Sequence, residues 1–531
     1  MTSTFIILIS LAAGLIATHA MRWGPAAGSD SAEYFEAARN LVNGDGLVLL
    51  RASGKVVPMT LRPPLYSVLL ALGSLLGLSL MATAKILDVL LLMGFIVIFG
   101  VSVQILLRSS LLALSVVILA LSAPAILMSF TEAMSEPLFL VLSVASFFSV
   151  AYYLQAPERR FVLVMGAIFA GFALLTRFFG IATLLASVFG LLVLENKHWK
   201  GRAVDGLIFL LIGISPMAIW LAKLLGSGDH PGIYNLPSES LWSATAPVRG
   251  AILNAIWNWT PFGLLVDDIT YVPRLILLVS LVVGSLFVVV ILIRWRGIPL
   301  TQALREPAIH LTVLFASFAV IYAIFLTATY VVVSVPRPAF VERIMLPIPF
   351  AGFLSLIFLL FFIERSIARR PMPGLFPLAL AVVVTLGNLQ TDIDTVVGMN
   401  KDGRGLTSQE WQTSETIAAL RELPDGLDIV SNQADVILLF LERSSFGIPE
   451  LETEQRAAEF LSFGEYPSTM AERVFREQGA VLVLFSTAYQ QFQAIYGPDA
   501  SRRLESFSKG LRVYSTHSDG TIYFWEESAP P

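Results

Sequence analysis

The sequence predicts a multi-span α-helical membrane protein whose carboxyl-terminal part forms a separate α/β domain. Three observations predict this fold class. Of the 531 residues, 56% are hydrophobic and only 14% are charged, whereas a soluble protein carries about 25% charged residues. Long apolar stretches recur up to about residue 390 and then stop. The charge also divides there, because residues 391–531 hold 11 basic and 22 acidic side chains, whereas residues 1–390 hold 24 and 17.

The composition excludes several classes of protein and site. The high apolar content excludes a disordered chain, and a net charge of −4 leaves no basic excess for nucleic acid as a partner. The chain has no cysteine, which excludes disulfide bonds, thiolate catalysis and cysteine-based zinc sites. The five histidines are too scattered along the sequence to form a paired metal-binding motif.

Eleven stretches are apolar and long enough to cross a membrane. A membrane-spanning helix needs about 20 apolar residues, because the hydrocarbon layer is about 30 Å thick and a helix rises about 1.5 Å per residue. The predicted spans are residues 4–21, 84–107, 110–128, 136–154, 161–176, 179–194, 203–225, 273–293, 307–334, 344–363 and 374–390. The first could also be a signal peptide, but no basic residue precedes it, which favours an uncleaved span.

The positions of the basic residues predict the orientation in the plasma (inner) membrane. Cytoplasmic connections are rich in Lys and Arg. Basic connections occur at residues 108, 159–160, 197–202, 294–305 and 365–370. If all are cytoplasmic, the N-terminus is cytoplasmic and the C-terminal domain is periplasmic or extracellular. This alternation requires that the stretch 64–80 does not cross. It is short, rich in glycine and follows two prolines, so we expect a juxtamembrane or re-entrant helix.

This orientation makes residues 1–390 a polytopic membrane domain with catalytic loops on its outer side. The outer loops are residues 22–83, 129–137, 226–272 and 335–343. The first two collect carboxylates, and the later outer turns collect arginines. The charged residues that we single out as a site are Asp30, Glu33, Glu132, Glu136, Arg177, Arg337 and Arg343.

Each acid has two interpretations. Asp30 begins a segment with apolar residues at helical spacing, where an acid can simply cap the helix. A carboxylate held at the membrane surface can also act as a general base, which contributes about 10²–10⁴ in rate. Glu132 and Glu136 lie four residues apart at the mouth of an apolar span, on one helix face. A carboxylate there is costly, which favours a function, although both could reach water at the helix end.

The arginines Arg177, Arg337 and Arg343 lie at the predicted outer interface. The planar donor fork of arginine suits a phosphate group, whereas an arginine at this depth can also extend toward lipid headgroups. Arg343 is the strongest candidate for phosphate, because it directly precedes a span. Lys85 and Asp88 lie three residues apart in one predicted span, where we expect a structural pair.

Residues 391–531 are predicted to form an outer α/β domain, long enough for a core of its own. A capping-box pattern at Thr407 and Glu410 predicts a helix from there to about residue 422. Strands are predicted at residues 427–432, 480–485, 511–516 and 521–525, with a turn at 517–520. Helices are predicted near residues 452–462, 467–478 and 499–508.

The order of these segments resembles a known family. The acidic outer segment SDSAEYFEAARNLVNGDG is followed by LRPPLYSVLLALGSLLG, then by TEAMSEPLF, LTRFFG and ERIMLPIP. This ordered set, over roughly residues 20–350, is similar to the GT-C glycosyltransferases, in the branch of protein O-mannosyltransferases and lipid A aminoarabinose transferases. The stretch WQTSETIAALRELP and the later IVSN are similar to the outer domain of bacterial members.

The resemblance implies an enzyme that moves a sugar from a polyprenyl-phosphate donor to a glycan, lipid or protein acceptor on the outer face. Asp30 matches the family's first-loop catalytic acid, Glu136 its second-loop acid and Arg343 its donor-phosphate arginine. Glu33 lies where many members carry a further acid. In some members the paired acids are adjacent, whereas two residues separate them here, so the role of Glu33 stays open.

The resemblance also bears on cofactors and on the leaving group. The developing charge of the leaving phosphate needs fixed cations, which Arg343 and also Arg337 or Arg177 can supply. Some members hold a divalent cation at their acids, whereas others work without one. Here a magnesium or manganese ion would be held by Asp30 and Glu136.

Two other functions stay open. A transporter or flippase of lipid-linked sugars should show internal repeats and charges at the membrane midplane. This sequence shows no repeat and places its acids at one face. A membrane scaffold with a partner-binding outer domain would not need the outer acids and arginines. Whether the chain is a glycosyltransferase, a transporter or a scaffold, membrane lipids are among its partners.

Overall fold

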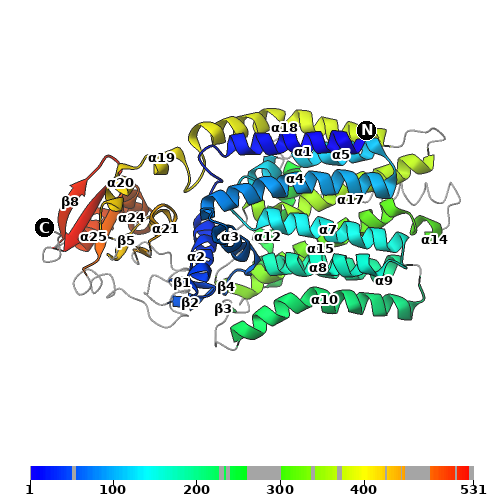
Figure 1. Ribbon diagram of the computed structural model, residues 1–531, viewed down its shortest axis with the longest axis horizontal. Coiled ribbons are helices and arrows are strands. Elements are labelled where there is room, and N and C mark those ends of the chain that lie inside the picture. Colours follow the sequence, from blue (N-terminus) through cyan, green and yellow to red (C-terminus); the bar gives the residue numbers. More distant parts are fainter. Residues whose placement is uncertain are drawn as a thin grey trace.

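The computed structural model describes residues 2–50, 56–122, 124–195, 197–225, 233–234, 240–259, 300–335, 341–367, 374–424, 427–443, 445–448, 479–508 and 511–525. The predicted span 273–293, Arg337 and the predicted helices near 452–462 and 467–478 lie outside the described residues. Most of the described chain is helical, and Figure 1 shows its long helices side by side in one bundle.

Seven described helices are long and apolar enough to cross a membrane. They are α1 (Thr2–Ala20), α4 (Leu80–Leu107), α7 (Glu136–Gln155), α10 (Trp199–Leu225), α15 (Pro307–Val332), α17 (Pro347–Ile367) and α18 (Leu375–Asp402). Shorter helices among them are α5 (Ser110–Leu121), α6 (Pro124–Ser129), α8 (Arg160–Thr176), α9 (Ile181–Leu194), α11 (Leu241–Ala244), α12 (Ala246–Asn258), α14 (Leu300–Ala303) and α16 (Glu342–Met345). The predicted class, a multi-span helical membrane protein, is confirmed, while the number of spans stays a prediction.

Two predicted spans differ in detail from their predicted form, whereas the stretch 64–80 forms a short helix as expected. The span 110–128 is divided into α5 and α6, because Pro124 has no N–H with which to continue the helix. The last span, 374–390, continues as α18 to Asp402. The stretch 64–80 forms α3 (Leu65–Leu75), whose 11 residues reach only about 16 Å. That length is too short for a hydrocarbon layer of about 30 Å.

Aromatic rings and small residues pack the bundle. Phe99 of α4 contacts Phe148 of α7 and Phe350 of α17 edge to face, with ring centroids 5.5 and 5.9 Å apart. A side chain at Gly171 of α8 would come within 2.6 Å of the carbonyl oxygen of Gly213 in α10, so glycine allows these two helices to approach closely. Such shape matching holds helices together in lipid, which supplies no hydrophobic force between them.

A five-stranded sheet lies beyond one end of the bundle (Figure 1). Its strands are β5 (Ile429–Ser431), β6 (Ser445–Gly447), β7 (Val481–Phe485), β8 (Leu511–Thr516) and β9 (Gly520–Trp525), in the order β6-β5-β7-β9-β8. β5 runs parallel to β6 and β7, whereas β9 runs antiparallel to β7 and β8. The helices of this part are α19 (Gln409–Gln412), α20 (Glu415–Arg421), α21 (Ala434–Leu441), α24 (Ala488–Tyr496) and α25 (Ala500–Ser508).

The strands β5, β7, β8 and β9 lie in or next to the four predicted stretches, and the predicted turn joins β8 to β9. The predicted capping box is wrong. The hydroxyl of Thr407 donates to the carbonyl of Pro25 (2.6 Å), and the expected helix forms as the two short helices α19 and α20. Ser414 begins the second of them by accepting from the N–H of Ile417. The division of the chain at residue 390 stays a prediction.

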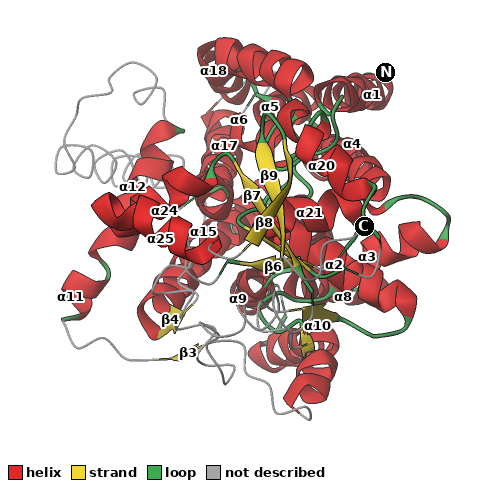
Figure 2. Ribbon diagram, turned by 90° about the vertical axis from the view of Figure 1, so that its left-hand side faces the viewer, coloured by secondary structure: helices red, strands yellow, loops and turns green. Residues whose placement is uncertain are grey.

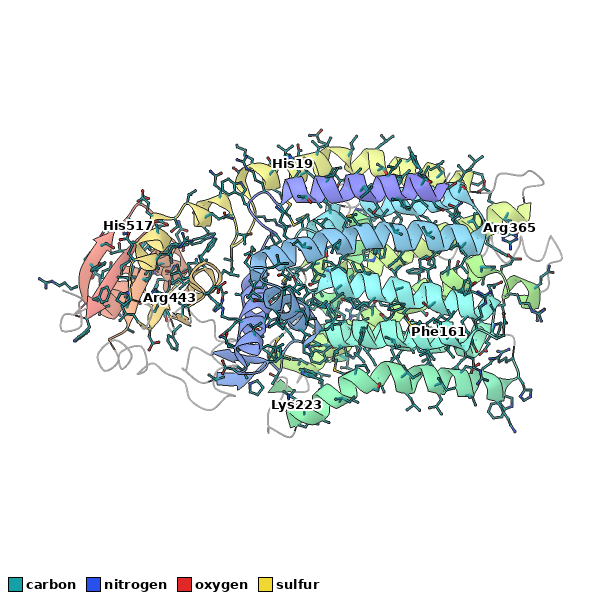
Figure 3. The ribbon with its side chains drawn as sticks, in the orientation of Figure 1. His19, Phe161, Lys223, Arg365, Arg443 and His517 are labelled. Carbon is teal, nitrogen blue, oxygen red and sulfur yellow. The ribbon has the colours of Figure 1, made fainter. Side chains whose placement is uncertain are left out.

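Different parts of the chain lie at the two ends of the bundle. The N-terminus, Phe161 and Arg365 lie at the end away from the sheet, whereas His19 and Lys223 lie toward the sheet (Figures 1 and 3). The helices α2 (Ser29–Asn43) and α3 also lie at the sheet end, and Figure 2 looks onto this end. The structure also describes two short strand pairs, β1 (Val48–Leu50) with β2 (Val56–Pro58) and β3 (Ile233–Tyr234) with β4 (Val333–Val335).

Candidate active site

Three segments that are far apart in the chain meet at the start of α2. The N–H of Ala26 donates to the carbonyl of Thr131 (2.8 Å), and the carbonyl of Ala26 accepts from the N–H of Ala133 (2.8 Å). The carbonyl of Ala27 accepts from the N–H of Leu406 (2.8 Å). Backbone hydrogen bonds therefore fix the start of α2 to the turn before α7 and to the segment that follows α18.

Asp30 lies in the first turn of α2. Gly28 is the residue that precedes the helix, and its N–H donates to the hydroxyl of Ser31 (3.0 Å), which fixes where the helix begins. The positive end of the helix dipole favours an ionised carboxylate in this turn. The oxygens of Asp30 contact arginine side chains instead of capping the helix, so the carboxylate faces its charged neighbours.

Two arginines contact Asp30. Nη2 of Arg343 lies 2.6 Å from Oδ2 of Asp30, and Arg62 pairs with the other oxygen and also with Glu33. Burial raises the pKa of Asp30, but the guanidinium groups of Arg62 and Arg343 outweigh that effect and hold the pKa below its usual value. Asp30 is therefore ionised at neutral pH, with 31% of its side chain exposed.

Arg343 also faces the acids at and just before the start of α7. Its guanidinium nitrogens lie 3.8 Å from Oε1 of Glu132 and 3.7 Å from Oε1 of Glu136. Arg177 contacts the same oxygen of Glu136 at 2.7 Å, and the Glu136 side chain is only 5% exposed. A buried carboxylate needs a cation of this kind. Arg343 thus lies among three carboxylates that come from α2, from the turn before α7 and from α7 itself.

A buried aromatic pair supports these charged groups. The rings of Tyr34 and Tyr66 meet edge to face with centroids 5.0 Å apart. The hydroxyl of Tyr34 forms a hydrogen bond with that of Ser135 (2.9 Å), next to Glu136. The guanidinium of Arg62 lies 5.7 Å from the centre of the Tyr34 ring, close enough for a cation–π attraction. This packing links α2, the loop before α3 and the start of α7.

The predicted site residues that the structure describes all lie in this cluster. They are Asp30, Glu33, Glu132, Glu136, Arg177 and Arg343. Arg337 lies outside the described residues. Arg62 was not predicted from the sequence. A signal for it exists, because a basic residue in a loop predicted to lie outside departs from the rule that basic residues stay in the cytoplasm.

The predicted pair between Lys85 and Asp88 is wrong. Nζ of Lys85 donates to the carbonyl of Met21 (2.6 Å), at the carbonyl end of α1, where the helix dipole favours a cation. Asp88 is fully buried, and neither of its carboxylate oxygens has a hydrogen-bond partner among the described residues.

The divalent cation expected at Asp30 and Glu136 stays a prediction. Within the described part of the chain, no three His, Cys, Asp or Glu side chains are grouped as a metal ion requires. Asp30 and Glu136, the two acids expected to hold such an ion, both face the guanidinium of Arg343. A fixed positive side chain lies between them, and the steps proposed below use no metal.

The comparisons with known proteins place the fold. No family model matches the chain, and no curated protein matches it. The crystal structure of ArnT from Cupriavidus metallidurans in the apo state matches with a TM-score of 0.53 at 13% identity, covering 100% of both chains. The same protein bound to undecaprenyl phosphate gives a TM-score of 0.54 at 14% identity, with the same coverage. The archaeal oligosaccharyltransferase AglB from Archaeoglobus fulgidus gives 0.48 at 13% identity, covering 100% of this chain and 75% of that one. This chain therefore has the fold of ArnT, and the fold expected from the resemblance to the GT-C glycosyltransferases is confirmed.

Proposed function

We propose that this protein is an integral-membrane glycosyltransferase, which moves a sugar from a polyprenyl-phosphate donor to an acceptor on the outer face of the membrane. One observation carries the proposal. Oδ2 of Asp30 and Nη2 of Arg343 lie 2.6 Å apart, although 313 residues separate them in the sequence. A group that can accept a proton and a group that can hold a phosphate are thus adjacent, in a bundle of apolar helices.

The transfer follows from these two groups. The oxygen of an acceptor hydroxyl attacks the anomeric carbon of the donor sugar, and its proton passes to the carboxylate of Asp30. The bond between that carbon and the phosphate oxygen breaks, and its electron pair leaves with the polyprenyl phosphate. Negative charge develops on the leaving oxygen, where Arg343 stabilises it. Arg177 and Arg62 add positive charge around the same centre.

Donor binding would also change the partners of Asp30. In the free protein Arg343 contacts Asp30. A donor phosphate that takes the guanidinium of Arg343 leaves Asp30 paired with Arg62 alone. The carboxylate then has unoccupied lone pairs, and the loss of one neighbouring cation makes it a stronger base. Arrival of the donor therefore prepares the base for the acceptor.

The donor class has support from the comparisons. One of the two ArnT structures is bound to undecaprenyl phosphate, and the cluster described here offers arginines to such a headgroup. The acceptor is a glycan, a lipid or a protein. We further propose that the chain lies in the plasma membrane with its N-terminus in the cytoplasm. Residues 391–531 then form an outer domain above the membrane domain.

The test compares binding with chemistry. The purified full-length protein is given a labelled polyprenyl-phosphate sugar, and donor binding and single-turnover transfer are measured separately. D30N should keep donor binding and lower the transfer rate by about 10²–10⁴-fold, the contribution of a general base. R343A should weaken donor binding as well as transfer. R502A, at an 80% exposed side chain, is the matched control and should change neither.

The outcomes separate the candidate functions. Normal transfer by D30N would contradict the role of Asp30 as the base. Movement of the lipid-linked sugar across the vesicle membrane, without any sugar transfer, would instead identify a transporter. Absence of both movement and transfer would favour a scaffold. Chelation by EDTA should leave wild-type transfer unchanged, because no step uses a divalent cation.

A further inference from the structure

Arg404 belongs to the segment that joins α18 to the sheet. Two hydrogen bonds fix this segment beside the start of α2: the N–H of Leu406 donates to the carbonyl of Ala27, and the hydroxyl of Thr407 donates to the carbonyl of Pro25. Gly405 has a φ of +64°, and a side chain there would come within 2.3 Å of the carbonyl oxygen of Ala27. The segment is therefore held beside residues 25–27, which shortly precede the first turn of α2.

The side chain of Arg404 is half-buried, and one of its terminal nitrogens is shielded from solvent. Its Nη1 is buried and has no hydrogen-bond partner among the described residues. Burying a hydrogen-bond donor without an acceptor costs free energy. A ligand that offers an acceptor oxygen to this nitrogen would remove that cost. The other three arginines of the cluster each have a carboxylate partner: Arg62 pairs with Asp30 and Glu33, Arg177 with Glu136, and Arg343 with Asp30.

Arg404 also acts electrostatically on an acid of the cluster, Glu132. Burial raises the pKa of Glu132, and Arg343 and Arg404 are the two cations that lower it. Arg343 lies 3.8 Å from that carboxylate. The backbone of Glu132 forms a bridge with that of Ala26, just as the backbone of Gly405 does with that of Ala27. Arg404 and Arg343 therefore act on one acid from two different segments.

We propose that Arg404 is a second cation of the donor-phosphate site and acts together with Arg343. This proposal rests on the proposed function. A phosphate group has several acceptor oxygens, so one oxygen pairs with the fork of Arg343 and another receives the unpartnered donor of Arg404. The group that completes the hydrogen bonds of Arg404 is thus the phosphate of the polyprenyl donor or of the polyprenyl phosphate product.

The experiment measures binding of undecaprenyl phosphate and of undecaprenol to the full-length protein in nanodiscs. The alcohol has the same tail without the phosphate, so the difference between the two lipids isolates the headgroup. R404A should weaken binding of the phosphate about ten- to hundred-fold, the range for a hydrogen bond to a charged group. It should leave binding of the alcohol unchanged. R404K should recover part of the loss, because lysine keeps the charge but not the fork.

The controls distinguish this proposal from the proposed function. R502A should bind both lipids as the wild type does. If R343A weakens phosphate binding and R404A does not, the role of Arg404 is wrong and the proposed function stands. If R404A weakens both lipids equally, Arg404 supports the fold instead, and the proposal is overturned. If neither R343A nor R404A affects phosphate binding, the donor-phosphate assignment itself fails.

Discussion

In the proposed transfer, Asp30 has to be ionised to accept a proton, and one of its oxygens has to be free when the acceptor arrives. The guanidinium groups of Arg62 and Arg343 meet the first demand, because they outweigh burial and hold the pKa of Asp30 below its usual value. The proposed exchange of Arg343 from Asp30 to the donor phosphate meets the second. Of the two contacts that keep Asp30 ionised, the donor thus breaks the one with Arg343 and leaves the one with Arg62.

This arrangement predicts a shift in pH dependence for R62Q. Burial raises the pKa of Asp30, and the guanidinium of Arg62 opposes that effect. Without this guanidinium, the pKa of Asp30 in the free enzyme should rise. The acid limb of kcat/KM, which reports the free enzyme, should then move to higher pH, because an opposite charge no longer favours the ionised carboxylate. The measurement is a pH profile of kcat/KM, with R502Q as the control. An unmoved acid limb in R62Q would contradict the assignment of Asp30 as the base.

Asp30, Glu136 and Arg343 could be predicted as candidates because a charge beside an apolar stretch stands out in the sequence. Their mutual contacts could not be predicted, since they depend on how α2, α7 and α16 meet. Arg62 was missed because the sequence does not show that its loop turns back onto α2. Arg404 was missed for a similar reason, because it follows the last predicted span and lies near the acids only through the pairing of Gly405 with Ala27.

The pairing of residues 25–27 with residues 131–133 and 405–406 is the element that assembles the site. It brings the turn before α7 and the segment after α18 to the first turn of α2. A second contact supports it from the sheet side, where Arg39 of α2 donates to the carbonyls of Leu438 and Glu442 at the end of α21. The elements around the sheet thereby help to hold the helix that carries Asp30.

G405A is predicted to disturb this pairing. A side chain at residue 405 would meet the carbonyl of Ala27 and would also require a left-handed backbone, which costs roughly 1–3 kcal/mol. We expect a lower melting temperature and slower sugar transfer. G398A is the matched control, because Gly398 lies in α18 with no atom within 4 Å of the added carbon, and alanine favours a helix by roughly 0.5–1 kcal/mol. Equal behaviour of the two variants would show that the pairing does not position the site.

At the level of elements, short runs rich in apolar, β-branched and aromatic residues were enough to predict four of the five strands of the large sheet, but not α21 or β6. The sequence of α21, ADVILLFL, is a short apolar run that fits a strand as well as a helix. β6 has only three residues, too few for a pattern to show. Thr407 fits the capping pattern in the sequence, but in the structure its hydroxyl donates to the carbonyl of Pro25 and does not cap a helix.

Across the whole molecule, the division of charge matches the two ends of the bundle. Basic connections such as the one at Arg365 lie at the end away from the sheet, whereas the acidic carboxyl-terminal part lies at the opposite end (Figure 3). Hydropathy was enough to predict the helical membrane class, because the cost of exposing polar groups to lipid governs the sequence directly. The packing of the helices against one another leaves no comparable trace in the sequence.

The absence of cysteine allows a direct test of orientation. In spheroplasts, an impermeant thiol reagent should label R502C, which lies near the sheet. It should label K200C, an exposed position at the start of α10, only after the membrane is opened. The reverse pattern would place the candidate site in the cytoplasm and would contradict transfer on the outer face.

In the proposed mechanism, Asp30 accepts the proton and Arg343 holds the phosphate of one transfer site. An experimental structure of the inactive D30N variant with a bound polyprenyl-phosphate sugar would show both groups at once. The phosphate should lie within hydrogen-bond distance of Arg343, and the anomeric carbon should face the side chain at position 30. A donor bound elsewhere on the bundle, or a phosphate that makes no contact with Arg343, would contradict it.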